Sequence, residues 1–206
     1  ETAKNEQTVF LKELVKVSQY INEIDMIVAS DSEQLLFKLH SIAKDLERYQ
    51  KTKSTIKEEA EAMFKNGLAT LDSNLIGTAF QVFHNLGHLN ETITSLLSQK
   101  CDQLSHLAPK IFAEYSNLRE QSRSSISNKQ LNVLKTIVRN NLKMLLDTVM
   151  THFSQVSTSV KVLKKRRDNY TQTLLIDFID SKEMIVANFW NEVLKILSSA
   201  FGSFFK

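Results

Sequence analysis

Hydrophobic residues follow a heptad rhythm along almost the whole chain. Between residues 10 and 28 the apolar positions step by four and three residues in alternation, and the same spacing resumes over residues 35–63. Two later stretches, residues 86–118 and 131–204, repeat it. Such spacing places apolar side chains on one helix face and is typical of helices packed side by side over their length. The pattern predicts an all-α protein built from three long helices, kinked or straight, with four helices as the alternative.

Polar stretches predict where these helices end. Asn66-Gly67 followed by Asp72-Ser73-Asn74 is a typical helix stop and a fresh N-cap. The stretch SRSSISN at residues 122–128 is the least periodic part of the chain, and it predicts the second turn. Asn140-Asn141 is a weaker alternative for that turn.

The first long helix contains a further interruption at residues 30–33. Ser30 and Glu33 have the spacing of a capping box. Either a new helix begins here, or the apolar seam slips by one residue and one helix runs from about residue 8 to 66. In the first case residues 1–30 form a separate amphipathic extension that folds back or touches a membrane.

Composition supports long, rarely broken helices. The 206 residues include one proline and four glycines, the two residue types that most often end helices. The single cysteine excludes an intramolecular disulfide and fits a reducing compartment. No apolar run is long enough to span a membrane, and no signal peptide is visible. Because a helix of about 50 residues reaches roughly 75 Å, such a hairpin usually completes its core with a partner chain.

Charge is distributed unevenly. The net charge is only +3, but residues 110–170 carry twelve basic and four acidic residues, a local net charge of +8. A cationic segment on an acidic body predicts contact with phosphate, in lipid headgroups or nucleic acid. The alternative is that these basic residues only solvate an exposed helix face and bind no ligand. The predicted anion-binding residues are Lys161, Lys164, Lys165, Arg166 and Arg167, followed by Lys129, Lys135, Arg139 and Lys143.

Few residues of the sequence are spaced as metal ligands or catalytic groups. His84 and His88 have the i, i+4 spacing of two metal ligands, but no third ligand is suitably placed. No glycine-rich phosphate loop and no nucleophile motif occurs. The sequence therefore predicts no catalytic residues, no metal, no cofactor and no enzymatic activity.

Four short motifs together carry a family resemblance. They are the helix end at residues 64–71, the string LIGTAFQVF at residues 75–83, the proline-centred residues 107–112, and the Phe-rich ending at residues 194–205. In this order and spacing they resemble BAR domains of the Arf GTPase-activating-protein type, and sorting-nexin BAR domains are equally similar. The resemblance covers most of the chain. It departs from the family in the apolar segment before Leu35 and in the unclear turn after helix two.

The resemblance implies a single BAR-like domain over residues 1–206, forming an elongated antiparallel coiled-coil homodimer shaped as a crescent. Its basic arms would lie on curved anionic phospholipid membrane, on endosomes or the plasma membrane, in the cytoplasm. Small GTPases or coat components would be further protein partners. The expected dimer interface comprises Phe80, Phe83, Phe189, Trp190, Leu197, Phe201 and Phe204.

A second hypothesis comes from a different class of function. A coiled-coil scaffold or tether subunit would bind other proteins through the same apolar seams and would not need the membrane. Nucleic-acid binding is disfavoured, because the aromatic residues near the basic cluster, such as Tyr170, fit predicted core positions and are not placed for base stacking.

Overall fold

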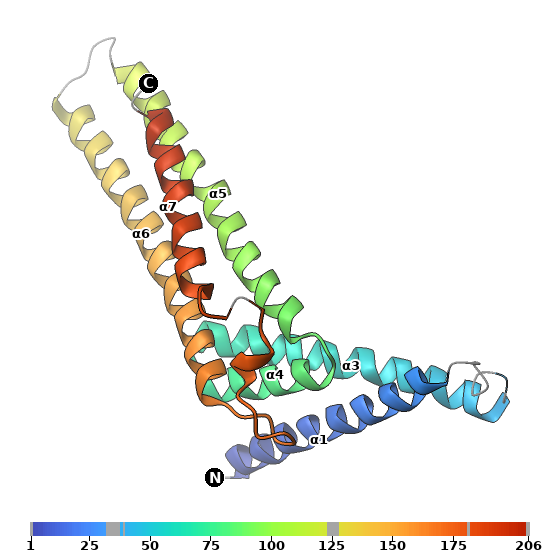
Figure 1. Ribbon diagram of the computed structural model, residues 1–206. Coiled ribbons are helices and arrows are strands. Elements are labelled where there is room, and N and C mark those ends of the chain that lie inside the picture. The colour runs from blue at the N-terminus through green and yellow to red at the C-terminus, as the bar shows by residue number, and fades with distance from the viewer. Residues whose placement is uncertain (1, 32–37, 39, 123–127, 181, 205–206) are drawn as a thin grey trace. The chain divides into compact units, whose positions relative to one another are not determined.

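The computed structural model describes residues 2–31, 38, 40–122, 128–180 and 182–204. Within these ranges the chain is helical, and the predicted all-α class is confirmed (Figure 1). The described α-helices are α1 (Thr2–Ser30), α3 (His40–Thr70), α4 (Ser73–Asn85), α5 (Leu89–Ser122), α6 (Asn128–Lys165) and α7 (Ile185–Phe204), with a short 3-10 helix η1 (Leu175–Phe178). The described helices outnumber the three that the sequence predicted.

The interruption near Ser30 is a true helix end. Helix α1 finishes at Ser30 and Asp31 is not helical. The hydroxyl of Ser30 donates to the carbonyl of Ile27, so it serves the end of α1. Of the two alternatives, the continuous helix is wrong. Glu33, the other half of the predicted capping box, lies outside the described residues.

The predicted N-cap after the first hairpin is confirmed at Asp72. Its side chain accepts hydrogen bonds from the backbone N–H of Asn74 at 2.8 Å and of Leu75 at 3.2 Å, and α4 begins at the next residue. The predicted stop at Gly67 is wrong, because α3 continues to Thr70. Gly67 instead permits close packing, since a Cβ there would meet the backbone nitrogen of Ile76 at 3.0 Å.

A second departure lies at Gly87, where the predicted second helix is divided into α4 and α5. Gly87 has φ +74, a left-handed conformation that favours glycine. Its N–H donates to the carbonyl of His84 and the N–H of His88 donates to that of Phe83. This is a Schellman motif, which ends helices and satisfies their last carbonyls. The left-handed conformation of Gly87 therefore ends the helix, although the apolar spacing continues through this position.

The predicted second turn is confirmed at its edges, while the predicted third helix is wrong. Helix α5 ends at Ser122 and α6 begins at Asn128; residues 123–127 lie outside the described residues. Asn140-Asn141, the alternative turn, lies inside α6. Helix α6 ends at Lys165, and a loop with η1 leads to α7. Tyr170, placed in the core by its spacing, is 78% exposed in that loop.

Contacts divide the chain into two compact units, so one domain over residues 1–206 stays a prediction. Unit 1 comprises Glu1–Ile93 and Thr158–Lys182. Its centre is α4, which packs against α3, α1 and η1. Ten of the thirteen α4 residues are buried, as expected of a helix enclosed on all sides. Phe80 and Phe83 of α4 both pack against Phe64 of α3.

Unit 2 comprises Thr94–Ser157 and Glu183–Lys206. Its hydrophobic core combines residues of α5, α6 and α7, among them Leu104, Leu145 and Val193. The ring of Phe112 in α5 packs on that of Phe201 in α7 at a centroid distance of 4.7 Å. Apolar residues of α7, which were expected to close a dimer, thus contribute to the core of a single chain.

Candidate functional site

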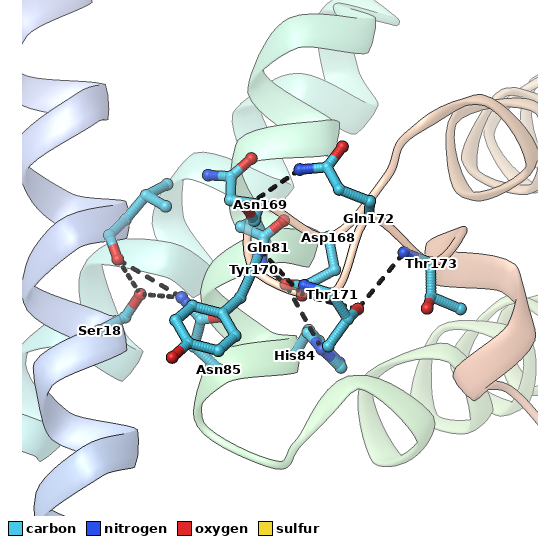
Figure 2. A network of polar contacts seen from close by, with 11 residues as sticks. Ser18, Gln81, His84, Asn85, Asp168, Asn169, Tyr170, Thr171, Gln172 and Thr173 are labelled. Carbon is cyan, nitrogen blue, oxygen red and sulfur yellow. Dashed lines mark hydrogen bonds and ion pairs between the residues drawn. The ribbon is translucent and has the colours of Figure 1, made fainter.

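The most elaborate polar arrangement in unit 1 surrounds Asp168, in the loop after α6 (Figure 2). The side chain is only 3% exposed. Its Oδ2 accepts hydrogen bonds from the backbone N–H of Tyr170 and Thr171 and from the Thr171 hydroxyl, at 3.1, 2.7 and 2.9 Å. Its Oδ1 accepts from Nε2 of Gln81 at 2.7 Å. The carboxylate therefore holds the loop residues in one conformation and connects the loop to α4.

The network continues from α4 to α1. Gln81 Nε2 also donates to Oδ1 of Asn85 at 3.0 Å, and Asn85 Nδ2 donates to Oγ of Ser18 at 2.8 Å. Ser18 in turn donates to the carbonyl of Val15 at 2.7 Å. Figure 2 shows this chain of contacts from the loop through α4 to α1. Buried polar groups are costly unless they are paired, so the network specifies how these three segments pack.

Ionisation of Asp168 follows from these contacts. Burial disfavours the charged form, but the hydrogen bonds from Thr171, Gln81 and Tyr170 outweigh it and lower the pKa of the carboxyl below its ordinary value. His84 lies 3.6 Å from Oδ1 of Asp168 and stacks on Phe178 at 4.2 Å. Burial lowers the pKa of His84, with Asp168 opposing that effect. The arrangement is therefore an ionised carboxylate beside a neutral imidazole.

Over the residues that the structure describes, no group of three His, Cys, Asp or Glu side chains is placed to hold a metal ion. His88, the other member of the i, i+4 histidine pair, contacts Glu91 through its Nδ1 at 2.8 Å. Burial, then the charges of Glu192 and Asp102, raise the pKa of the Cys101 thiol, which disfavours the nucleophilic thiolate.

The predicted basic cluster lies at the end of α6 and the start of the Asp168 loop, all within unit 1. Lys161, Lys164, Lys165 and Arg167 are exposed, whereas Arg166 is half-buried. A Cβ on Gly77 of α4 would meet the Arg166 side chain at 3.0 Å, so Arg166 packs along α4. Burial lowers the pKa of Arg166. Four of the five predicted cations therefore face solvent, and the fifth has a structural contact.

The second group of predicted basic residues lies on the part of α6 that belongs to unit 2. Lys135, Arg139 and Lys143 are exposed there. The side chain of Lys129 lies outside those that the structure describes. Because the two groups fall in different units, the structure does not establish one continuous basic surface. The contact of either group with an anionic membrane stays a prediction.

The residues predicted at the dimer interface divide between the two units. Phe80 and Phe83 are almost completely buried in unit 1, and Phe189 is buried in unit 2. Leu197 packs against the core of unit 2, and the Trp190 ring, 39% exposed, packs edge-on against Phe153. Phe201 is 40% exposed against Phe112, and the side chain of Phe204 lies outside the described ones. The homodimer itself stays a prediction.

An apolar surface runs along α1, the segment for which the sequence offered a separate amphipathic extension as one of two alternatives. The heptad seam of this helix is split: Leu14 and Ile21 are buried, whereas Phe10 is 50% exposed and Ile24 also faces solvent. Further apolar side chains widen the exposed side. The α1 apolar face, as defined here, consists of Val9, Phe10, Tyr20, Ile24 and Ile27, all exposed.

Helix α1 is firmly attached on its other side. Asp25 accepts a hydrogen bond from the Tyr49 hydroxyl at 2.5 Å and pairs with Lys53 of α3 at 2.7 Å. Together with Ser18 in the network and the buried seam residues, these contacts fix which side of α1 faces outward. Helix α1 is therefore anchored on one side and presents large apolar side chains on the other.

These features define the class of protein: an all-helical protein with a structural polar network and an exposed apolar face on α1. Comparison with known proteins then gives the family. A sequence model described as "Conserved oligomeric Golgi complex subunit 5, C-terminal" matches residues 36–206, most of the chain. The chain belongs to this family.

A curated relative agrees with the family assignment. The protein named conserved oligomeric Golgi complex subunit 5 from Mus musculus is 28% identical over 204 residues, covering 93% of this chain. The chain spans only 24% of the length of that relative. No solved structure matches the chain.

The family assignment corrects the BAR-domain prediction, of either the Arf GTPase-activating-protein or the sorting-nexin type, which is wrong. The membrane-curvature function expected from that resemblance falls with it. The physical reason is that the quoted motifs describe close helix packing, which many helical folds require. Gly67 and Phe80, for example, serve the packing of α3 against α4 within one chain.

Proposed function

We propose that this chain is a helical scaffold or tether subunit that binds other proteins within a multi-subunit complex at the Golgi. The observation that carries the proposal is the α1 apolar face on a helix anchored to α3 and α4. The family supports the same function, since its name is that of a subunit of an oligomeric complex. Peripheral association with Golgi membranes, on the cytoplasmic side, replaces the endosomal or plasma-membrane location expected from the BAR resemblance.

The magnitude of such an interaction follows from the exposed area. Burial of a large apolar side chain stabilises an interface by about 1.5–3 kcal/mol. Phe10 and Ile27 are 50% and 60% exposed, so each retains about half of that free energy for a partner. Two such residues therefore contribute about 2 kcal/mol, and their replacement by aspartate also places charge in the interface.

The experiment uses the full-length protein and measures which other subunits of the complex co-purify with it. Phe10→Asp combined with Ile27→Asp is expected to reduce recovery of at least one subunit by about ten-fold or more, since 1.4 kcal/mol corresponds to a factor of ten. The matched control is Gln50→Asp with Thr55→Asp, two exposed polar positions on α3 that receive the same charge change. Unchanged recovery of every subunit with the double α1 variant would contradict the proposal.

A further inference from the structure

The loop after α6 has a fixed backbone conformation. Arg167 and Leu174 form an antiparallel bridge, and the N–H of Asp168 donates to the carbonyl of Thr173 at 2.8 Å. The turn between them closes at Gln172, which adopts a left-handed φ of 59. Arg167 fastens the same turn by donating from its guanidinium to the Gln172 carbonyl at 2.8 Å. The loop is therefore closed by its own backbone and held to α4 through the buried carboxylate of Asp168.

This fixed loop presents Tyr170 to solvent. The ring is 78% exposed, while the backbone N–H of the same residue is one of the donors to Asp168. Part-buried hydrogen bonds to Asp168 thus fix the backbone of a residue whose side chain is largely in water. A preorganised loop loses little conformational entropy on binding, and tyrosine is enriched among the residues that dominate protein interfaces.

Positive charge lies at the end of α6, just before the same loop, and at its start. Lys161, Lys164 and Lys165 have i, i+3 and i, i+4 spacings at the end of α6, which place them on neighbouring positions of one helix side. All three are exposed, as is Arg167. In the part of the chain that the structure describes, none of these four is ion-paired with a carboxylate. The nearby Asp168 does not supply a free anion, since its oxygens are occupied within the loop.

We infer that this surface binds an acidic segment of another subunit of the complex. The Tyr170 surface is defined by Lys161, Lys164, Lys165, Arg167 and Tyr170. Carboxylates of the partner pair with the four cations, and the tyrosine ring enters an apolar pocket of the partner. The inference rests on the proposed function and adds a second contact site, on the end of α6 and the loop after it and not on α1.

A protein partner is favoured over lipid by the form of the loop. Attraction of lysine and arginine to an anionic membrane requires only that the charges approach the surface, at about 1 kcal/mol each. It does not require a loop held in one conformation by buried hydrogen bonds. The fixed backbone and the single exposed aromatic ring instead suit a surface of defined shape.

The test uses the full-length protein in two variants. Tyr170→Ala removes the ring and retains the backbone donor to Asp168, so the fold is preserved. Lys164→Glu with Lys165→Glu reverses two exposed charges, and its matched control is Lys51→Glu with Lys65→Glu on α3. Each of the other subunits, purified singly, is the probe in one arm. Vesicles of phosphatidylcholine with phosphatidylserine are the probe in the other.

We expect both Tyr170-surface variants to weaken binding of the same one subunit by about ten-fold or more, with wild-type binding decreasing as salt rises. The control and the double α1 variant should leave that contact unchanged. Wild-type binding to a subunit that neither Tyr170-surface variant weakens would overturn this inference alone. Loss of vesicle binding in the charge-reversal variant, with subunit binding intact, would assign the surface to lipid and also overturn it. Failure of wild type to bind any subunit would overturn the proposed function as well.

Discussion

The buried carboxylate of Asp168 gives the sharpest test of how unit 1 is held together. Replacement by alanine removes the acceptor for four hydrogen bonds, contributed by Gln81, Tyr170 and Thr171. Gln81 Nε2 keeps its hydrogen bond to Asn85, whereas the backbone N–H groups of Tyr170 and Thr171 lose the acceptor that they share. An orphaned buried donor costs about 1–3 kcal/mol, and these two N–H groups are only partly buried. Asp168→Ala should therefore lower the free energy of unfolding by about 2–4 kcal/mol.

A conservative replacement separates charge from shape. Asp168→Asn keeps one carbonyl oxygen but presents an amide group either to Gln81 or to the loop N–H groups, so we expect a loss of about 2 kcal/mol. The lowered pKa of Asp168 adds a pH dependence. Its stabilising contribution is present above the ordinary value of 3.8 and is lost as pH falls through the lower folded value. The difference between wild type and Asp168→Asn should shrink over that range.

The assay is urea unfolding followed by circular dichroism, with amide hydrogen exchange to locate the change. Protection should fall first in residues 166–174 and in α4. Asp177→Asn is the matched control, because this carboxylate lies in the same segment but forms only a partly exposed ion pair with Lys182. Such pairs contribute less than about 1 kcal/mol. If Asp168→Ala costs no more than this control, the network does not position the loop and the reasoning is refuted.

Two further predictions concern packing and protonation. Gly67→Ala should destabilise the protein by about 1–2 kcal/mol despite the better helix propensity of alanine, because the new Cβ meets the backbone of Ile76 at 3.0 Å. Gly202→Ala, whose Cβ would meet nothing within 4 Å, should stabilise the protein by up to about 1 kcal/mol. Thermal unfolding of the two variants checks these opposite signs. Burial and the charge of Lys100 lower the pKa of His152 to about 4. Only the unfolded chain gains this proton as pH falls from 6.5 to 4, so stability should decrease by up to about 3 kcal/mol over that range. His152→Gln should show a shallower dependence in urea titrations at each pH, and equal slopes would contradict the assignment.

The BAR prediction shows where sequence patterns mislead. A heptad seam records only that a helix face is apolar, and the same spacing serves packing within a chain or against a partner. Phe83 was predicted at a dimer interface, yet it packs on Phe64 inside unit 1. Tyr170 was predicted in a core, because the seam was extended through a segment that is not helical. The prediction for Tyr170 was wrong because it took apolar spacing alone as evidence that the helix continues.

The sequence by itself determined the all-α class and several helix ends, because caps and breaks depend on neighbouring residues. Asp72 caps α4 through hydrogen bonds to the next few residues, and α5 ends at Ser122 and α6 begins at Asn128, the limits of the polar stretch in the sequence. Only the tertiary structure decided which apolar residues face inward and what the loop after α6 does. Asp168 is bound to Gln81, 87 positions away in the sequence. No local pattern records such a contact, since it forms only when α4 and the loop are packed together.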